Sequence, residues 1–238
     1  MGDVRQERIN AAVQDAVSDA VAAVKPRLRG WLHAATFPLA LAAGIVLVWL
    51  VPGASTKVGA AVYALSAALL FGVSAVYHRG TWSPRVNEVL KRFDHANIFV
   101  IIAGSNTPFA LLLLPPDEAR LLLGIVWGGA AIGVAMRLLW ASAPRWAFVP
   151  LYLLLGWAAV LWLPQYARSG GPAVLTLVIV GGVCYSLGAV VYGTQRPDPW
   201  PRWFGFHEVF HAFTLAGFTT QHVGVWLAAF GVGSAAAA

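Results

Sequence analysis

WLHAATFPLALAAGIVLVWLV, residues 31–51, contains no charged side chain. At about 1.5 Å of rise per residue, an α-helix of this length spans about 30 Å, the hydrocarbon thickness of a bilayer. The whole chain of 238 residues is 59% hydrophobic and 11% charged, whereas roughly 25% of the residues of a soluble domain are charged. A soluble protein of this size could not bury so much apolar surface, so we expect an integral membrane protein.

Seven such apolar stretches follow one another along the chain, separated by turn-forming residues such as Pro52-Gly53 and Pro115-Pro116. Their continuous apolar pattern predicts helices. The expected spans are Trp31–Val51, Val58–His78, Asp94–Leu114, Leu121–Leu139, Trp146–Leu163, Val174–Val191 and His207–Phe230. The sequence therefore predicts an all-α bundle of seven transmembrane helices over residues 31–231. An amphipathic segment, residues 1–30, is expected before it and a short tail, residues 232–238, after it.

The distribution of basic residues predicts the orientation of this bundle. Thirteen of the 16 lysines and arginines fall in the N-terminal segment and the second, fourth and sixth loops. The opposite side has only Lys57, Arg120 and Arg168. Basic residues favour the cytoplasmic side, so we expect a cytoplasmic N-terminus, an outer C-terminus and a multi-pass protein of the inner cell membrane. The net charge of +6 then reflects topology, and no nucleic-acid partner is expected.

Ionisable residues inside membrane spans are costly and are therefore functional candidates. His78 ends the second span, Asp94 begins the third, and His207 and His211 lie in the first turns of the seventh, all at the expected cytoplasmic face. The last two histidines are four residues apart, about 40° around the helix and about 6 Å along it. Ser74 lies one turn from His78 on the same face. Three histidine nitrogens with an open position are typical of catalytic zinc.

Other metal sites fit the pattern less well. Two histidines four apart on one helix cannot approach a haem from opposite faces. The single cysteine, Cys184, excludes a Cys-ligated cluster and an intrachain disulfide. His207-Glu208-Val209-Phe210-His211 also matches H-E-x-x-H, the zincin protease motif in which the glutamate is the general base. No L-D-G-type segment supplies the further carboxylate ligand of intramembrane proteases, so a protease remains a weaker alternative.

Three motifs give the chain a family resemblance. They are Ser74-Ala75-Val76-Tyr77-His78, Phe93-Asp94-His95 and His207-Glu208-Val209-Phe210-His211. Together they resemble the hemolysin III family of the progestin and adipoQ receptor superfamily, which is similar to alkaline ceramidases. The resemblance spans essentially all seven helices. It implies zinc held by His78, His207 and His211, with Asp94 at the zinc-bound water and Ser74 beside it. Asn106 stands where many relatives carry a bulkier residue, which implies an altered substrate cavity.

These observations favour a zinc-dependent hydrolase that acts on a lipid-like amide or ester, with Asp94 as acid and base and Ser74 as a hydrogen-bonding group. Membrane lipids are the expected partners. The alternative is a non-enzymatic receptor, pore or regulator of membrane homeostasis, in which zinc only clamps the second and seventh spans. The remaining polar residues of the spans have weaker assignments. His33 is expected beside the metal ligands, His95 and Arg137 at the cytoplasmic interface, and His222 about 16 Å deeper than His211.

Overall fold

The computed structural model describes residues 26–140 and 145–235, and regular structure there is helical except for an isolated bridge between Trp200 and Phe204. The elements are α2 (Trp31–Leu50), α3 (Ala54–Arg79), α4 (Pro84–Leu113), α5 (Pro116–Leu139), α6 (Arg145–Gly156), the 3₁₀ helix η1 (Ala158–Trp162), α7 (Leu163–Thr194) and α8 (Phe206–Ala235). Most of the predicted amphipathic segment, residues 1–25, and the end of the tail, residues 236–238, lie outside the described residues.

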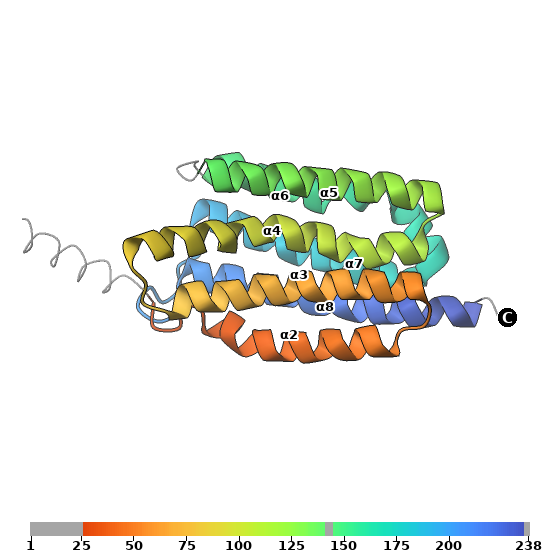
Figure 1. Ribbon diagram of the computed structural model, residues 1–238, viewed down its shortest axis with the longest axis horizontal. Coiled ribbons are helices and arrows are strands. Elements are labelled where there is room, and N and C mark those ends of the chain that lie inside the picture. The colour runs from red at the N-terminus through yellow and green to blue at the C-terminus, as the bar shows by residue number, and fades with distance from the viewer. Residues whose placement is uncertain (1–25, 141–144, 236–238) are drawn as a thin grey trace, which may run out of the picture.

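The helices form one bundle whose members run roughly along its long axis (Figure 1). Neighbours along the chain pack side by side, as α2 with α3, α3 with α4, α4 with α5, and α7 with α8. Helix α8 also contacts α2, α3 and α4, so it closes the bundle between its first and last elements. One end of the bundle holds the end of α3 and the beginnings of α4 and α8 (Figure 1). We call it the site end.

The outer surface of this bundle is apolar, while part of its interior is polar. Leu39, Trp49, Leu139 and Leu161 are each at least 70% exposed. Buried polar residues include histidines, an aspartate, an arginine and a glutamate. Within residues 26–140 and 145–235, five helical stretches are long and apolar enough to cross a membrane, one of which joins α6, η1 and α7 into a single stretch of 48 residues. An apolar exterior around a polar interior is what a bundle in lipid requires, because lipid tails solvate the apolar side chains.

Helix α4 begins earlier than the apolar pattern indicates. Its N-cap is Ser83 and its first residue is Pro84, whose missing N–H is tolerated in the first turn. Asp94, predicted at the start of the span, therefore lies nearly three turns inside the helix. It is not the helix cap, and its carboxylate points into a buried site instead.

The gap between the expected spans Trp146–Leu163 and Val174–Val191 is not a loop, because α7 runs through it with a kink at Gly171. Gly171 has φ 76° and ψ 176°, a backbone conformation that side chains with a Cβ rarely adopt. The adjoining Pro172 has no N–H to give to the helix ladder. Together they interrupt the helix without ending it, because residues on both sides remain helical.

Two backbone contacts fix the chain before α2 at the site end. The N–H groups of Arg27 and Leu28 donate to the carbonyls of Arg202 and Trp203 at 3.0 and 3.1 Å. Gly30 then turns the chain into α2 with φ 79°, and a Cβ there would lie 2.5 Å from the Cβ of His78. Only glycine allows α2 to begin so close to α3, and this approach places the start of α2 beside the buried histidines.

Candidate metal centre

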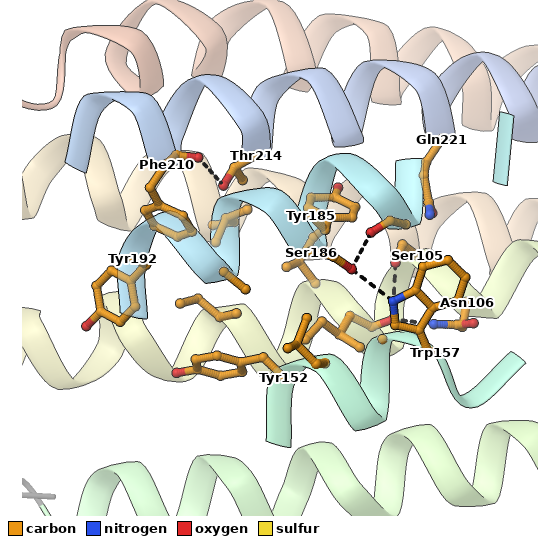
Figure 2. Close-up of a pocket in the computed structure, with 18 of the residues that line it drawn as sticks. Ser105, Asn106, Tyr152, Trp157, Tyr185, Ser186, Tyr192, Phe210, Thr214 and Gln221 are labelled. Carbon is orange, nitrogen blue, oxygen red and sulfur yellow. Dashed lines mark hydrogen bonds between the residues drawn. The ribbon is translucent and has the colours of Figure 1, made fainter. Parts of the chain in front are cut away.

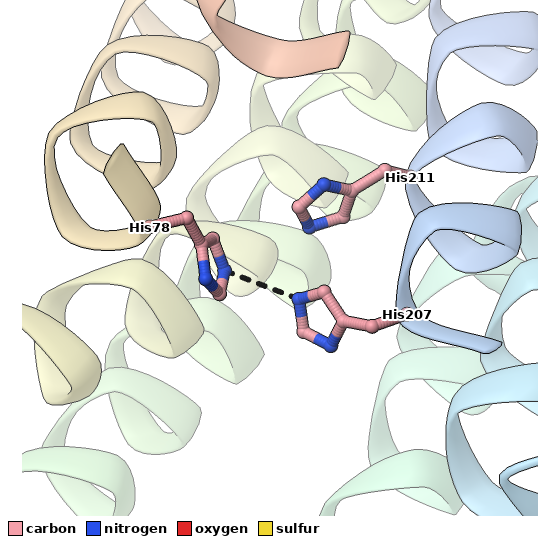
Figure 3. Close-up of side chains that lie close together, drawn as sticks. All are labelled: His78, His207 and His211. Carbon is pink, nitrogen blue, oxygen red and sulfur yellow. Dashed lines mark hydrogen bonds between the residues drawn. The ribbon is translucent and has the colours of Figure 1, made fainter. Parts of the chain in front are cut away.

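Three buried histidines from two helices converge at the site end. His78 comes from the last turns of α3, and His207 and His211 come from the first turns of α8 (Figure 3). Each offers a ring nitrogen that lies within 4.8 Å of the other two. The Nε2 atoms of His78 and His207 are 3.1 Å apart. We call these three residues the histidine triad.

The triad fits a metal ion. Two nitrogens that bind one zinc ion at about 2.0–2.1 Å lie at most about 4.2 Å apart, so the triad needs only a small contraction to bind one ion. The Nδ1 atom of His211 is buried without a hydrogen-bond partner among the described residues. Buried polar atoms are normally paired. Three convergent imidazoles, one of them with an unpartnered nitrogen, are therefore a donor set for a metal ion.

Asp94 and Ser74 flank this triad, as their spacing predicts. The Oδ2 atom of Asp94 is 3.6 Å from Nε2 of His78, too long for a good hydrogen bond but close enough for a shared water. Ser74 is buried, and its hydroxyl has no partner among the described residues. Both residues line the same internal pocket as His207 and His211. A carboxylate and a free hydroxyl thus face the space beside the triad.

His33 lies against the triad with its ring stacked on one of the three histidines. Its ring stacks on that of His211 with 3.7 Å between centroids and 11° between planes, and it meets Phe71 edge to face. Lone pairs of two parallel rings do not converge on one point. His33 is thus placed beside the metal ligands, as the sequence indicates, and it packs against His211.

Glu208, the central residue of the H-E-x-x-H match, is directed away from the triad. Its fully buried carboxylate accepts a hydrogen bond from Nε of Arg29 at 2.5 Å. It also accepts one from the backbone N–H of Gly205 at 2.8 Å, at the beginning of α8. An acidic group at a helix N-terminus is favourable. Because both oxygens are engaged in these contacts, this geometry argues against a zincin-type base at Glu208.

Another buried histidine, His95, lies beside Asp94 and is held by a buried arginine. His95 is buried, and its Nδ1 accepts a hydrogen bond from the guanidinium of Arg137 at 2.5 Å. Its Nε2 meets the hydroxyl of Tyr192 at 3.1 Å, and its backbone carbonyl accepts from Tyr152 at 3.2 Å. Arg137 is buried over the ring of Phe148, 4.7 Å from its centroid. Both side chains are therefore buried inside the bundle and paired with each other, while their depth in the membrane stays a prediction.

The sequence does not predict this second cluster, because its members come from α4, α5, α6 and α7. The one available signal is the presence of an arginine and a histidine in apolar helices, which predicts burial with a partner as readily as an interfacial position. His222 is a simpler case. Its Nε2 accepts a hydrogen bond from the indole N–H of Trp226 at 3.0 Å, and it is not among the residues lining the pocket.

The pocket beside the triad extends far into the bundle. It has a volume of about 110 Å³ and reaches along α8 from His207 to Gln221, which is about 21 Å at 1.5 Å per residue. Its middle is lined by apolar side chains such as Ile98, Ile102 and Phe210. Asn106 also lines it, as the resemblance implies for a cavity residue. The pocket thus extends from a polar end at the triad into a mostly apolar passage, and Figure 2 shows part of its lining between Tyr192 and Gln221.

Comparison with known proteins gives the context of this site. The haemolysin-III related family matches residues 21–222, which include the whole triad. The chain is 30% identical over 165 residues to Hemolysin-3 of Bacillus cereus, covering 69% of this chain and 72% of that protein. It is 31% identical over 157 residues to the Hemolysin-3 homolog of Bacillus subtilis, covering 66% and 70%.

A plant protein shares the same region. The chain is 28% identical over 181 residues to a heptahelical transmembrane protein of Oryza sativa, covering 69% of this chain and 79% of that protein. With its apolar helices, this makes the chain a multi-pass membrane protein. A family match over most of the chain, together with these relatives, shows that it belongs to the haemolysin-III related family.

Proposed function

We propose that this protein is a zinc-dependent hydrolase that cleaves an amide or ester of a lipid at the cytoplasmic face of the inner membrane. The observation that carries the proposal is the histidine triad beside Asp94 and the unpartnered hydroxyl of Ser74, at one end of a long apolar pocket. Three nitrogen donors leave one position of a tetrahedral zinc site open for water or substrate. The apolar passage suits the chain of a lipid.

Seven membrane crossings are part of this proposal. The 48-residue stretch Ala147–Thr194 would be about 72 Å long as a straight helix, about twice the hydrocarbon thickness. In Figure 1, α6 and α7 lie side by side with the turn between them at the end away from the site. The other four apolar stretches give four crossings, Ala147–Thr194 gives two, and α8 gives one, which makes seven. The name of the Oryza sativa relative, heptahelical, supports the same number.

The charge pattern supports the orientation. The site end carries Arg29, Arg79 and Arg92 together with the loop that holds Arg196 and Arg202. Under the positive-inside rule this end faces the cytoplasm. The triad would then open toward the inner leaflet, so that a lipid could enter the pocket with its reactive group near the histidines.

Each residue has a defined task in this mechanism. When bound by His78, His207 and His211, zinc would act as a Lewis acid that acidifies water and polarises a carbonyl. Asp94 accepts a proton from the attacking water and returns one to the leaving amine or alcohol. The Ser74 hydroxyl donates a hydrogen bond to the oxygen that develops negative charge. The buried surroundings strengthen both contacts because bulk water is excluded.

The decisive experiment separates metal binding from turnover. Purified wild-type protein, His78→Ala and Asp94→Asn are assayed for bound metal by plasma mass spectrometry and for release of fatty acid from a panel of N-acyl amides and esters. We expect about one zinc per chain in the wild type and in Asp94→Asn, and little in His78→Ala. Asp94→Asn is expected to lose about 10²–10⁴-fold in turnover, the usual contribution of a general acid–base.

Two results would contradict the proposal. A folded wild-type protein without zinc, after purification free of chelators, would exclude the metal mechanism. Full turnover in Asp94→Asn would remove the role of this carboxylate. Zinc in the wild type with no hydrolysis of any amide or ester would favour the alternative in which the metal only clamps α3 to α8.

A further inference from the structure

The pocket has a second polar end. Its lining includes Gln221, ten residues beyond His211 on α8, and this spacing corresponds to about 15 Å along the helix. Figure 2 shows the Gln221 side chain reaching from α8 toward Asn106 and Trp157 on the opposite wall. Between this group and the triad the lining is mostly apolar, and the hydroxyls of Thr214, Ser105 and Ser186 there each donate to a backbone carbonyl. The pocket therefore has polar groups at both ends, and the hydroxyls of these three residues between them already have partners.

The groups at the deep end lack partners. Among the described residues, the buried hydroxyls of Tyr166 and Tyr185 have no hydrogen-bond partner, although both residues line the pocket. Gln221, which lines the same end of the pocket, is 9% exposed. A buried unpaired polar group costs about 1–3 kcal/mol. Two such groups in the lining of one pocket, with the Gln221 amide beside the same space, indicate that a ligand atom pairs with them.

The chemistry of the deep end selects a neutral group. Among the described lining residues, the single Asp, Glu, Lys or Arg is Asp94, and it lies at the triad end. A phosphate or carboxylate at the deep end would be buried without a countercharge, which is very costly. Phenol and carboxamide groups both donate and accept hydrogen bonds. A hydroxyl or keto oxygen fits them.

We propose that the deep end is a recognition site for a neutral hydroxyl or keto group carried on the lipid chain, about 15 Å from the amide or ester that faces the triad. The lipid class is therefore an acyl chain with a polar group near its far end. This inference rests on the proposed function in one respect only, the orientation of the ligand with its amide or ester toward the histidines. The hydrogen bonds at the deep end are independent of zinc and of turnover.

The test is a comparison of two matched ligands, dodecanamide and 12-hydroxydodecanamide. When the chain is extended, the amide and hydroxyl of the second ligand lie about as far apart as the two polar ends of the pocket. Binding to the full chain in nanodiscs is measured by isothermal titration calorimetry, with partitioning into empty nanodiscs subtracted. We expect the wild type to bind the hydroxylated ligand about tenfold more tightly, the effect of a well-made buried hydrogen bond.

Two variants and two controls locate the effect. Gln221→Leu and Tyr185→Phe are expected to reduce the tenfold preference to about one or below. Thr219→Val, on the exposed side of the same helix, removes a hydroxyl bonded to the carbonyl of Leu215 and should retain the preference. Thr194→Val should retain it too, because this exposed hydroxyl at the end of α7 bonds the carbonyl of Val190 and is not in the pocket lining.

The outcomes distinguish this inference from the proposed function. Equal affinities for the two ligands in the wild type would overturn the inference, because the deep groups would then hold only water. A preference that survives in Gln221→Leu combined with Tyr185→Phe would also overturn it. A preference that is lost in these variants, in a protein that hydrolyses nothing, would support the binding site while the hydrolase proposal fails.

Discussion

The histidine triad and His95 both lie beside Asp94 and are buried to a similar degree, yet they differ in their partners. In the triad, the Nε2 atoms of His78 and His207 are 3.1 Å apart, Asp94 lies 3.6 Å from His78, and Nδ1 of His211 has no partner among the described residues. By contrast, Arg137 and a tyrosine engage both ring nitrogens of His95. Burial is therefore no indicator of a metal ligand in this bundle. The better indicator of a metal ligand is a ring nitrogen that converges with others and has no hydrogen-bond partner outside the cluster.

The strongest test of this comparison is the same substitution in each group. His207→Phe removes one of three ligands, so we expect bound zinc to fall from about one per chain to nearly none, measured by plasma mass spectrometry. His95→Phe should leave zinc near one per chain. It should lower the free energy of unfolding by about 1–3 kcal/mol, because Arg137 loses its partner inside the bundle. Equal loss of zinc in the two variants would contradict the assignment.

The apolar stretches predict the fold well, because burial in lipid depends on composition more than on detailed contacts. Their ends are predicted less well. The polar turns of α4 between Pro84 and Phe93 extend the helix beyond the apolar stretch, and hydropathy does not detect them. The 3₁₀ turns of η1 and the kink at Gly171 depend on local backbone geometry, which a pattern of apolar residues does not specify.

The triad was predictable because two of its members share a helix face and the third lies at the same depth. Those two facts follow from helical spacing and the order of the spans. The partners of Glu208 and His95 were not predictable. They depend on how each helix is rotated about its axis, and on contacts such as that between Arg29 and Glu208, which are 179 residues apart. Sequence spacing alone left Glu208 as a possible catalytic base.

The pair between Arg29 and Glu208 provides the next test, since it contrasts a buried ion pair with an exposed one. Glu208→Gln leaves the Arg29 charge without a countercharge. Because Arg29 is 19% exposed, we expect a loss of about 2–3 kcal/mol, somewhat below that for a fully buried pair. Glu88→Gln breaks a half-exposed pair with Arg92 and should cost less than about 0.5 kcal/mol. Thermal unfolding in the same detergent measures both.

The same variant sharpens the distinction between a structural and a catalytic glutamate. If Glu208 only holds the beginning of α8 to α2, Glu208→Gln should retain zinc, and the turnover of the folded fraction should stay within about threefold of the wild type. A loss of about 10²–10⁴-fold would be the loss expected of a general base. That result would restore the zincin interpretation of H-E-x-x-H.

The smallest expected effect separates a paired hydroxyl from an unpaired one. The hydroxyl of Tyr152 donates to the carbonyl of His95, so Tyr152→Phe should cost about 1 kcal/mol of unfolding free energy. The buried hydroxyl of Tyr166 has no partner among the described residues, so Tyr166→Phe should be neutral or slightly stabilising when no ligand is bound. Both substitutions remove a hydroxyl oxygen at a buried site. The difference between their effects on the free energy of unfolding, measured by thermal unfolding, is therefore the contribution of the hydrogen bond that only Tyr152 makes. Equal destabilisation would mean that the Tyr166 hydroxyl is paired in the membrane, for example by water, and would weaken the argument from unpaired groups at both ends of the pocket.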